Sequence, residues 1–126
     1  MKVIVVDDSE IVRKRIDNML SKLEGVENVF VVSSRNEAIA MLGKRKLDVA
    51  IIDIHLPEGS GIELLKYIKK YFLNMKVIML CNSALIQYRK ICYESGADFF
   101  FDKSSEFEEV SKLLLRISDT KPQNST

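Results

Sequence analysis

Four charged residues of this chain stand at the ends of apolar runs, where a folded sheet could gather them. Asp7 and Asp8 follow the first run, Asp53 ends the third, and Lys103 comes shortly after the fifth. Should neighbouring strands deliver these residues to one edge, three carboxylates and one ammonium would converge there. Clustered carboxylates repel one another unless a cation intervenes. A hard divalent ion such as Mg²⁺ suits them, because it takes one or two carboxylates together with phosphate oxygens.

Such a cluster can carry out phosphoryl chemistry. A carboxylate at its centre, Asp53, can act as a nucleophile toward phosphorus and form an aspartyl-phosphate. Phosphoryl transfer needs positioning and charge neutralisation more than covalent help, and a metal ion and Lys103 would supply both. The simpler interpretation makes the aspartates ordinary turn residues. We favour the site, because three separate strand ends carry matching groups.

The elements that must position these groups alternate regularly along the chain. Five short apolar runs are typical of strands buried on both faces, namely 3–6, 29–32, 49–52, 77–80 and 99–101. Each run is followed by a helical pattern. Five strands alternating with five helices predict one α/β domain, with a parallel sheet, helices on both faces and right-handed crossovers.

The helical segments have recognisable starts and ends. Ser9 can cap the first helix, and Ser34 with Glu37 has the spacing of a capping box for the second. Glycines 25, 43 and 96 are candidate stops. The apolar stripes comprise Val12, Ile16, Met19, Leu20 and Leu23; Ala38, Ile39 and Leu42; Ile62, Leu65, Ile68 and Phe72; Leu85, Ile86, Tyr88, Ile91 and Cys92; and Phe107, Val110, Leu113, Leu114 and Ile117.

Composition excludes several function classes. The chain has 126 residues, 47% of them apolar and 29% charged, with a formal net charge of +1. There is no global field to attract nucleic acid or membrane, and the basic clusters, such as 44–46, are expected to be solvated faces. The two cysteines suit reduced thiols. No run approaches the roughly 18 apolar residues of a membrane span. We expect a cytoplasmic protein.

Taken together, these motifs resemble the receiver domain of two-component response regulators. The matching features are Asp7-Asp8 after an apolar strand, Asp53 with Pro57 and Gly61 at family spacing, and Gly96-Ala97-Asp98 leading to Lys103. The resemblance implies a flavodoxin-like (βα)5 three-layer sandwich, with a five-stranded parallel sheet in the order 2-1-3-4-5. We expect a receiver domain over residues 1–119 and a polar, disordered tail over 120–126.

The resemblance also implies roles for the clustered residues. Asp53 would accept a phosphoryl group from a phosphohistidine on a sensor histidine kinase or a histidine phosphotransfer protein. One Mg²⁺ would be bound by Asp8, Asp53 and the backbone carbonyl of His55, with Asp7 acting through water, and Lys103 would contact the phosphoryl oxygens. At most, such a protein catalyses its own phosphorylation and dephosphorylation.

Three positions depart from the family pattern. Cys81 stands where the family has Thr or Ser, and a thiol is a weak hydrogen-bond donor, so the coupling of phosphorylation to loop movement should be weaker. Ser104 replaces a proline that follows a cis bond, and we expect a trans bond here. Phe100 occupies the aromatic switch position, where the absence of a hydroxyl should favour its inward state.

We expect a stand-alone receiver that signals by protein contact through its fourth helix, fifth strand and fifth helix, with surface candidates Leu85, Ile86, Tyr88 and Phe100. One alternative is a receiver-like binding module that no longer switches. Another is a haloacid-dehalogenase-type phosphatase, but its second aspartate is replaced by His55. DNA binding is disfavoured, because no helix-turn-helix follows residue 118.

Overall fold

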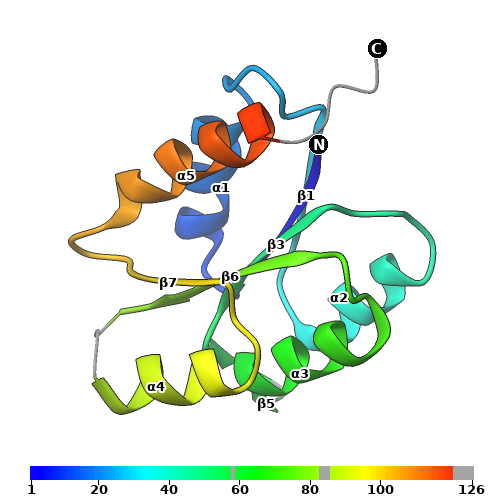
Figure 1. Cartoon of the computed structure of the whole chain (residues 1–126), viewed down its shortest axis with the longest axis vertical. Coiled ribbons are helices and arrows are strands. Elements are labelled where there is room, and N and C mark those ends of the chain that lie inside the picture. Colours follow the sequence, from blue (N-terminus) through cyan, green and yellow to red (C-terminus); the bar gives the residue numbers. More distant parts are fainter. Residues whose placement is uncertain (58, 83–85, 121–126) are drawn as a thin grey trace.

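A five-stranded parallel sheet forms the centre of the molecule (Figure 1). The computed structural model describes residues 1–57, 59–82 and 86–120. The strands lie in the order β2-β1-β3-β6-β7, which is 2-1-3-4-5 when these five are counted along the chain. This confirms the flavodoxin-like α/β fold. Their bounds are β1 Lys2–Val6, β2 Asn28–Val32, β3 Val49–Asp53, β6 Lys76–Cys81 and β7 Phe99–Asp102.

Helices cover both faces of the sheet, as expected from the alternation of strands and helices. Helices α1 and α5 lie on one face of the sheet, and helices α2, α3 and α4 lie on the other (Figure 1). Because strand side chains alternate between the two faces, each face has its own apolar core. The helix bounds are α1 Glu10–Leu20, α2 Arg35–Leu42, α3 Gly61–Tyr71, α4 Ile86–Glu94 and α5 Phe107–Thr120.

The central strands are the most deeply buried. Every residue of β3 is buried, and so are the last five residues of β6. Strand β1 pairs in parallel with β2 on one side and β3 on the other. Parallel pairing in this register brings the carboxyl ends of β1, β3, β6 and β7 to the same edge, the edge that carries the predicted chemistry.

The helices start at the predicted capping residues, but the complete capping box forms at a different helix from the one predicted. Ser9 accepts a hydrogen bond from the backbone N–H of Val12, as a cap should. Ser34 caps α2, but the Glu37 side chain accepts from the N–H of Ser33, so the predicted reciprocal box does not close there. The complete capping box instead starts α3, where Ser60 and Glu63 exchange both bonds.

The stop signals differ from one another. Gly43 caps α2 as expected. Helix α1 already ends at Leu20, and Gly25 lies in the following turn with φ of +94°. Gly96 follows α4 with φ of +108°, in the left-handed region that glycine tolerates best.

Two details of the apolar stripes were predicted wrongly. Ile91 was expected in the buried stripe of α4, but it is 42% exposed, and Cys92 beside it is fully buried. Leu64 was missed, although it is fully buried on α3. Both errors reflect the direction in which each helix faces the sheet, which short stripes define poorly. Leu85, which was predicted in the α4 stripe, lies outside the described residues. Helix α5 continues through Thr120, and the rest of the predicted tail, 121–126, also lies outside them.

The loop after Asp53 contains a small second sheet that the sequence patterns did not predict. Strand β4 (His55–Leu56) pairs antiparallel with β5 (Gly59–Ser60). The N–H of Gly61 then donates to the carbonyl of Ile54 at 2.6 Å. A Cβ at Gly61 would overlap the carbonyl oxygen of Asp53. Glycine is therefore required where α3 begins against the end of β3.

Candidate functional site

The three predicted carboxylates meet at one edge of the sheet. Asp7 and Asp8 follow β1, and Asp53 is the last residue of β3, the adjacent strand. One oxygen from each of the three carboxylates lies within 4.8 Å of the others. Asp7 and Asp53 are buried, whereas Asp8 is exposed. The tertiary structure thus assembles the acidic cluster that the strand ends predicted.

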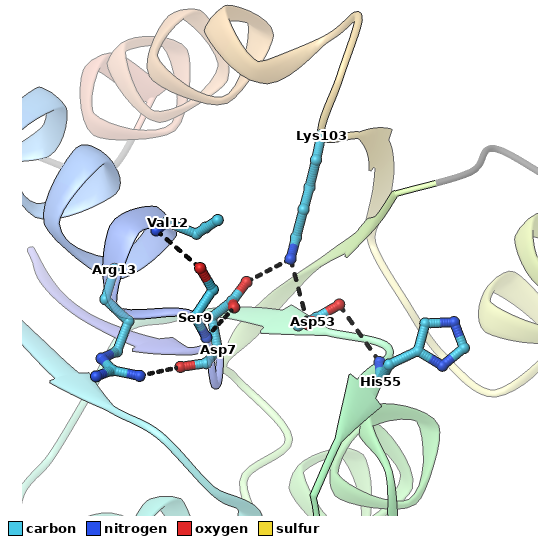
Figure 2. Close-up of polar contacts among 7 residues, drawn as sticks. All are labelled: Asp7, Ser9, Val12, Arg13, Asp53, His55 and Lys103. Atoms are coloured by element: carbon cyan, nitrogen blue, oxygen red, sulfur yellow. Dashed lines mark hydrogen bonds and ion pairs between the residues drawn. The ribbon is translucent and has the colours of Figure 1, made fainter.

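Lys103 completes the cluster from the far side, as Figure 2 shows. Its Nζ lies 2.6 Å from Asp7 Oδ2 and 3.2 Å from Asp53 Oδ2. The side chain is only 8% exposed. Its backbone N–H donates to the carbonyl of Cys81 at 2.8 Å, which ties the loop after β7 to the end of β6. One ammonium therefore bridges two buried carboxylates.

Backbone groups hold the carboxylates in place (Figure 2). Asp7 Oδ1 accepts a hydrogen bond from the N–H of Ser9 at 2.9 Å, and the Asp7 carbonyl accepts one from Arg13 at 2.8 Å. Asp53 Oδ1 accepts from the N–H of His55 at 3.3 Å. These contacts leave the other oxygen of each carboxylate directed at Lys103.

Burial and the charges of the neighbouring groups act against each other on the pKa values of Asp53 and Lys103. It raises the pKa of Asp53, since desolvation penalises the carboxylate; the charge of Lys103 opposes this rise and that of Asp7 adds to it. Burial would lower the pKa of Lys103, but its close contact with Asp7 and the charges of Asp53 and Asp7 outweigh that effect and raise the pKa overall. Lys103 is thus a permanent cation at neutral pH.

The donor set fits a hard divalent cation. Three carboxylates supply oxygen ligands, the type that Mg²⁺ prefers. Asp7 Oδ2 is fully buried, and among the described residues its only partner is the Lys103 ammonium, without a well-formed hydrogen bond. Buried carboxylate oxygens normally have more partners than this. A cation beside Asp7 and Asp53 would supply the missing charge compensation.

Cys81 lies in an apolar environment. It ends β6, is 1% exposed and packs in the core beneath α2, α3 and α4, together with Cys92 and Phe100. Burial, with a smaller contribution from Cys81, raises the pKa of the Cys92 thiol to about 11. Neither Cys81 nor Cys92 forms a disulfide. The residue that replaces the family's hydroxyl is therefore part of a core.

Phe100 points inward, and its role as a switch residue stays a prediction. It is 2% exposed, and the guanidinium of Arg89 lies 5.1 Å from its ring centroid. Arg89 also pairs with Glu106 at 3.8 Å. Glu106 in turn accepts a hydrogen bond from the N–H of Asp102 at 3.0 Å. The sequence analysis did not single out Arg89, because no local pattern indicates that α4 contacts the loop before α5. The bond between Lys103 and Ser104 is trans, as expected.

His55 reaches α4 rather than the carboxylates. Its ring meets Tyr88 edge-on, with centroids 5.8 Å apart. The two rings line a hollow of about 350 Å³. Tyr88 is only partly exposed. Among the side chains that the structure describes on α4 and α5, the large apolar ones that face water are Ile91, Tyr93 and Leu115, at 40–44% exposure. Leu85 and the side chain of Ile86 lie outside the described part of the chain, so the predicted contact surface stays a prediction.

Fold and site together define a class: a flavodoxin-like domain with an acidic cluster and a lysine at the carboxyl edge of its parallel sheet. Comparison with known families agrees, since the family model for the response regulator receiver domain matches residues 3–115. The chain belongs to the response regulator receiver family.

Individual relatives support this assignment. A protein-glutamate methylesterase/protein-glutamine glutaminase of Trichodesmium erythraeum is 38% identical over 90% of this chain and 33% of its own length. The Francisella response regulator 1452 receiver domain superposes with a TM-score of 0.83 at 27% identity, covering 95% of this chain and 98% of that one. For the chemotaxis regulator CheY4 of Vibrio cholerae the TM-score is 0.82 at 25% identity, with 92% and 97% covered.

The chain is shorter than its curated relatives. It spans 33%, 38% and 53% of the length of three that it matches. Those proteins carry further sequence beyond the part aligned here, so their activities as whole proteins do not transfer to this chain. Within the described residues, no helix has the length and apolar character needed to span a membrane.

Proposed function

We propose that this chain is a Mg²⁺-dependent phosphoacceptor. Asp53 receives a phosphoryl group from a phosphohistidine on a sensor histidine kinase or a histidine phosphotransfer protein, and the chain then signals by protein contact. The observation that carries the proposal is the Lys103 ammonium bridging Asp7 and Asp53 at the edge where three carboxylates converge. We place this activity in the cytoplasm.

The transfer uses the chain's own groups in simple roles. An oxygen of the Asp53 carboxylate attacks phosphorus; the O–P bond forms as the N–P bond of the donor histidine breaks, and the electron pair leaves with the imidazole. Lys103 contacts both carboxylates and can hold phosphoryl oxygens once they arrive. Asp8, Asp53 and the His55 carbonyl would hold Mg²⁺, with Asp7 acting through water. The bound ion would neutralise phosphoryl charge.

A receiver-like module that no longer switches is the second candidate. It is favoured by Cys81, whose thiol lies in an apolar core, and by Phe100, which is already inward. A switch needs two arrangements that differ in their contacts with the phosphoryl group. Intact Asp7, Asp53 and Lys103 favour the phosphoacceptor.

Mass spectrometry of the intact protein separates these candidates. After incubation with acetyl phosphate and Mg²⁺, the parent chain should gain one phosphoryl mass, and Asp53→Asn should gain none. Asp17→Asn on α1 is the matched control and should behave like the parent. Omission of Mg²⁺ with excess EDTA should abolish the gain.

Other outcomes point elsewhere. If the parent gains no mass while Mg²⁺ still shifts the amide resonances of Asp7, Asp8 and Asp53, the non-switching module is correct. Phosphate release in large excess over protein would indicate a phosphatase.

A further inference from the structure

A second hollow lies at the opposite edge of the sheet from the acidic cluster. It is a cavity of about 540 Å³, and its lining residues come from the connection between α2 and β3 and the connection between α3 and β6, with the last residue of each helix. Both connections precede their strands, whereas Asp53 and Lys103 come at strand ends. In a parallel sheet these are opposite edges. The cavity is therefore separate from the phosphoacceptor site.

One wall of this cavity is basic. Lys44, Arg45 and Lys46 are consecutive, exposed and part of its lining. The Arg45 guanidinium is held 4.7 Å from the ring centroid of Phe30. Among the described residues, neither Lys44 nor Lys46 has a carboxylate within ion-pair distance.

The one carboxylate in the lining, Asp48, is bonded to the backbone of β1. Asp48 Oδ2 accepts a hydrogen bond from the backbone N–H of Lys2 at 2.7 Å, and the Asp48 N–H donates to the Lys2 carbonyl. Asp48 thereby ties the start of β3 to the start of β1. The two lysine ammonium groups remain available to an anionic ligand.

Most of the other lining residues are apolar. Tyr71 is 58% exposed and Leu73 is 77% exposed, although both are large apolar side chains. Leu42, Leu47 and Met75 are buried and belong to the same lining. Single exposed apolar residues are common on protein surfaces. Here two exposed apolar residues, Tyr71 and Leu73, line the same cavity as buried apolar side chains, so an apolar side chain of a ligand can pack against them.

We propose that this cavity binds an acidic segment of a partner protein anchored by one apolar side chain. The carboxylates of the segment would face Lys44 and Lys46, and the anchor would enter between Tyr71 and Leu73. The volume lies within the roughly 300–1,000 Å³ of ordinary ligand sites.

Charge and shape favour a peptide over other anionic partners. Membrane-binding surfaces typically gather about four to eight basic residues, and nucleic-acid contacts need a comparable basic stripe. This cavity has three, on a chain of net charge +1. A cavity of about 540 Å³ with several apolar lining residues suits one aliphatic or aromatic side chain better than a lipid surface or a sugar-phosphate backbone.

An NMR titration tests the site directly. The ¹⁵N-labelled chain is titrated with a synthetic peptide in which glutamates flank one phenylalanine. We expect amide shifts confined to residues 43–48 and 71–75, with affinity that falls as NaCl is raised. A matched peptide with alanine in place of phenylalanine should bind several-fold more weakly, because the anchor is lost.

Variants identify the two walls. The double variant Lys44→Glu with Lys46→Glu should weaken binding about tenfold, since each attraction becomes a repulsion. The control, Lys66→Glu with Lys90→Glu, changes net charge equally on exposed sites of α3 and α4 and should bind within about twofold of the parent. Leu73→Ser should weaken peptide binding several-fold without changing the net charge of the chain.

Several results would overturn the proposal: no shifts at millimolar peptide, shifts outside the two connections, or equal losses in the target and control variants. Tighter binding of anionic vesicles or of duplex DNA at the same residues would also overturn it. Asp53→Asn should bind the peptide like the parent, so failure at one site is distinguishable from failure at the other.

Discussion

Replacement of Lys103 by methionine tests whether the ammonium holds the acidic cluster together. Methionine keeps much of the length and apolar stem of lysine and removes only the charged end. The change leaves Asp7, 1% exposed, and Asp53, at 6%, facing each other without their cation. Lys103→Met should therefore strongly destabilise the fold in the absence of divalent metal.

The distances set the size of this effect. At an effective dielectric constant of about 20, attraction across 2.6 Å is roughly 6 kcal/mol, and across 3.2 Å roughly 5 kcal/mol. The free-energy cost of burying the Lys103 ammonium offsets much of these two attractions. Because Lys103→Met has no ammonium to bury, the variant loses the attractions but is also spared this cost. Breaking a buried ion pair by removing one partner typically costs about 3 to 5 kcal/mol. We expect a loss of about 4 kcal/mol.

The assay is urea unfolding at pH 7 in excess EDTA. Asp7→Asn is the informative comparison, because Lys103 keeps its pair with Asp53 and the repulsion between the two carboxylates disappears. That variant should lose less than about 2 kcal/mol. Lys112→Met, which removes an exposed pair with Glu109, should change stability by less than about 1 kcal/mol.

Acid should reduce the loss in Lys103→Met. Burial already raises the pKa of Asp53 in the parent, and without the opposing ammonium this pKa rises further. A carboxyl with a raised pKa in the folded state favours folding more as pH falls, so the deficit should narrow toward about pH 5. A Lys103→Met variant within about 1 kcal/mol of the parent at pH 7, or a deficit that grows in acid, would refute this account of the cluster.

Three further predictions concern other residues. Burial raises the pKa of Cys92 from 9.0 to about 11, so the free energy of unfolding of the parent should fall as pH rises through this window. The difference in unfolding free energy between the parent and Cys92→Ala should narrow by about 3 kcal/mol. Parallel pH profiles of the two proteins in urea unfolding would contradict this. Gly61→Ala should destabilise by more than about 2 kcal/mol and slow phosphorylation of Asp53, whereas Gly43→Ala, whose Cβ meets nothing closer than 3.6 Å, should unfold like the parent. Cys81→Thr should enlarge the phosphorylation-dependent change in partner affinity, and an unchanged response would show that the thiol does not limit coupling.

The sequence was sufficient for the sheet and for the charged groups at its edge. Five apolar runs separated by helical stripes allow few arrangements, because parallel strands need crossovers and crossovers are right-handed. The strand order came from the family resemblance. Asp7, Asp53 and Lys103 were identifiable because a charge that interrupts an apolar run has few structural explanations.

Local signals were less decisive where two segments competed for one role. Ser34 and Glu37 have capping-box spacing, yet Glu37 bonds to Ser33, and the full box forms at Ser60 instead. The small sheet of His55–Leu56 with Gly59–Ser60 was also missed. Two-residue strands carry no periodicity, so only the path of the chain around Gly61 reveals them.

What the sequence alone determined is the fold and the chemical identity of the acidic edge, because apolar periodicity and strand-end charges are local properties of the chain. Tertiary structure decided which oxygens Lys103 contacts, that Cys81 lies in an apolar core, and that Arg89 rests on the Phe100 ring. It also joined the basic run at 44–46 to exposed Tyr71 and Leu73 around one cavity. These contacts join residues far apart in the chain, and their geometry depends on how helices pack on the sheet, which no local pattern encodes.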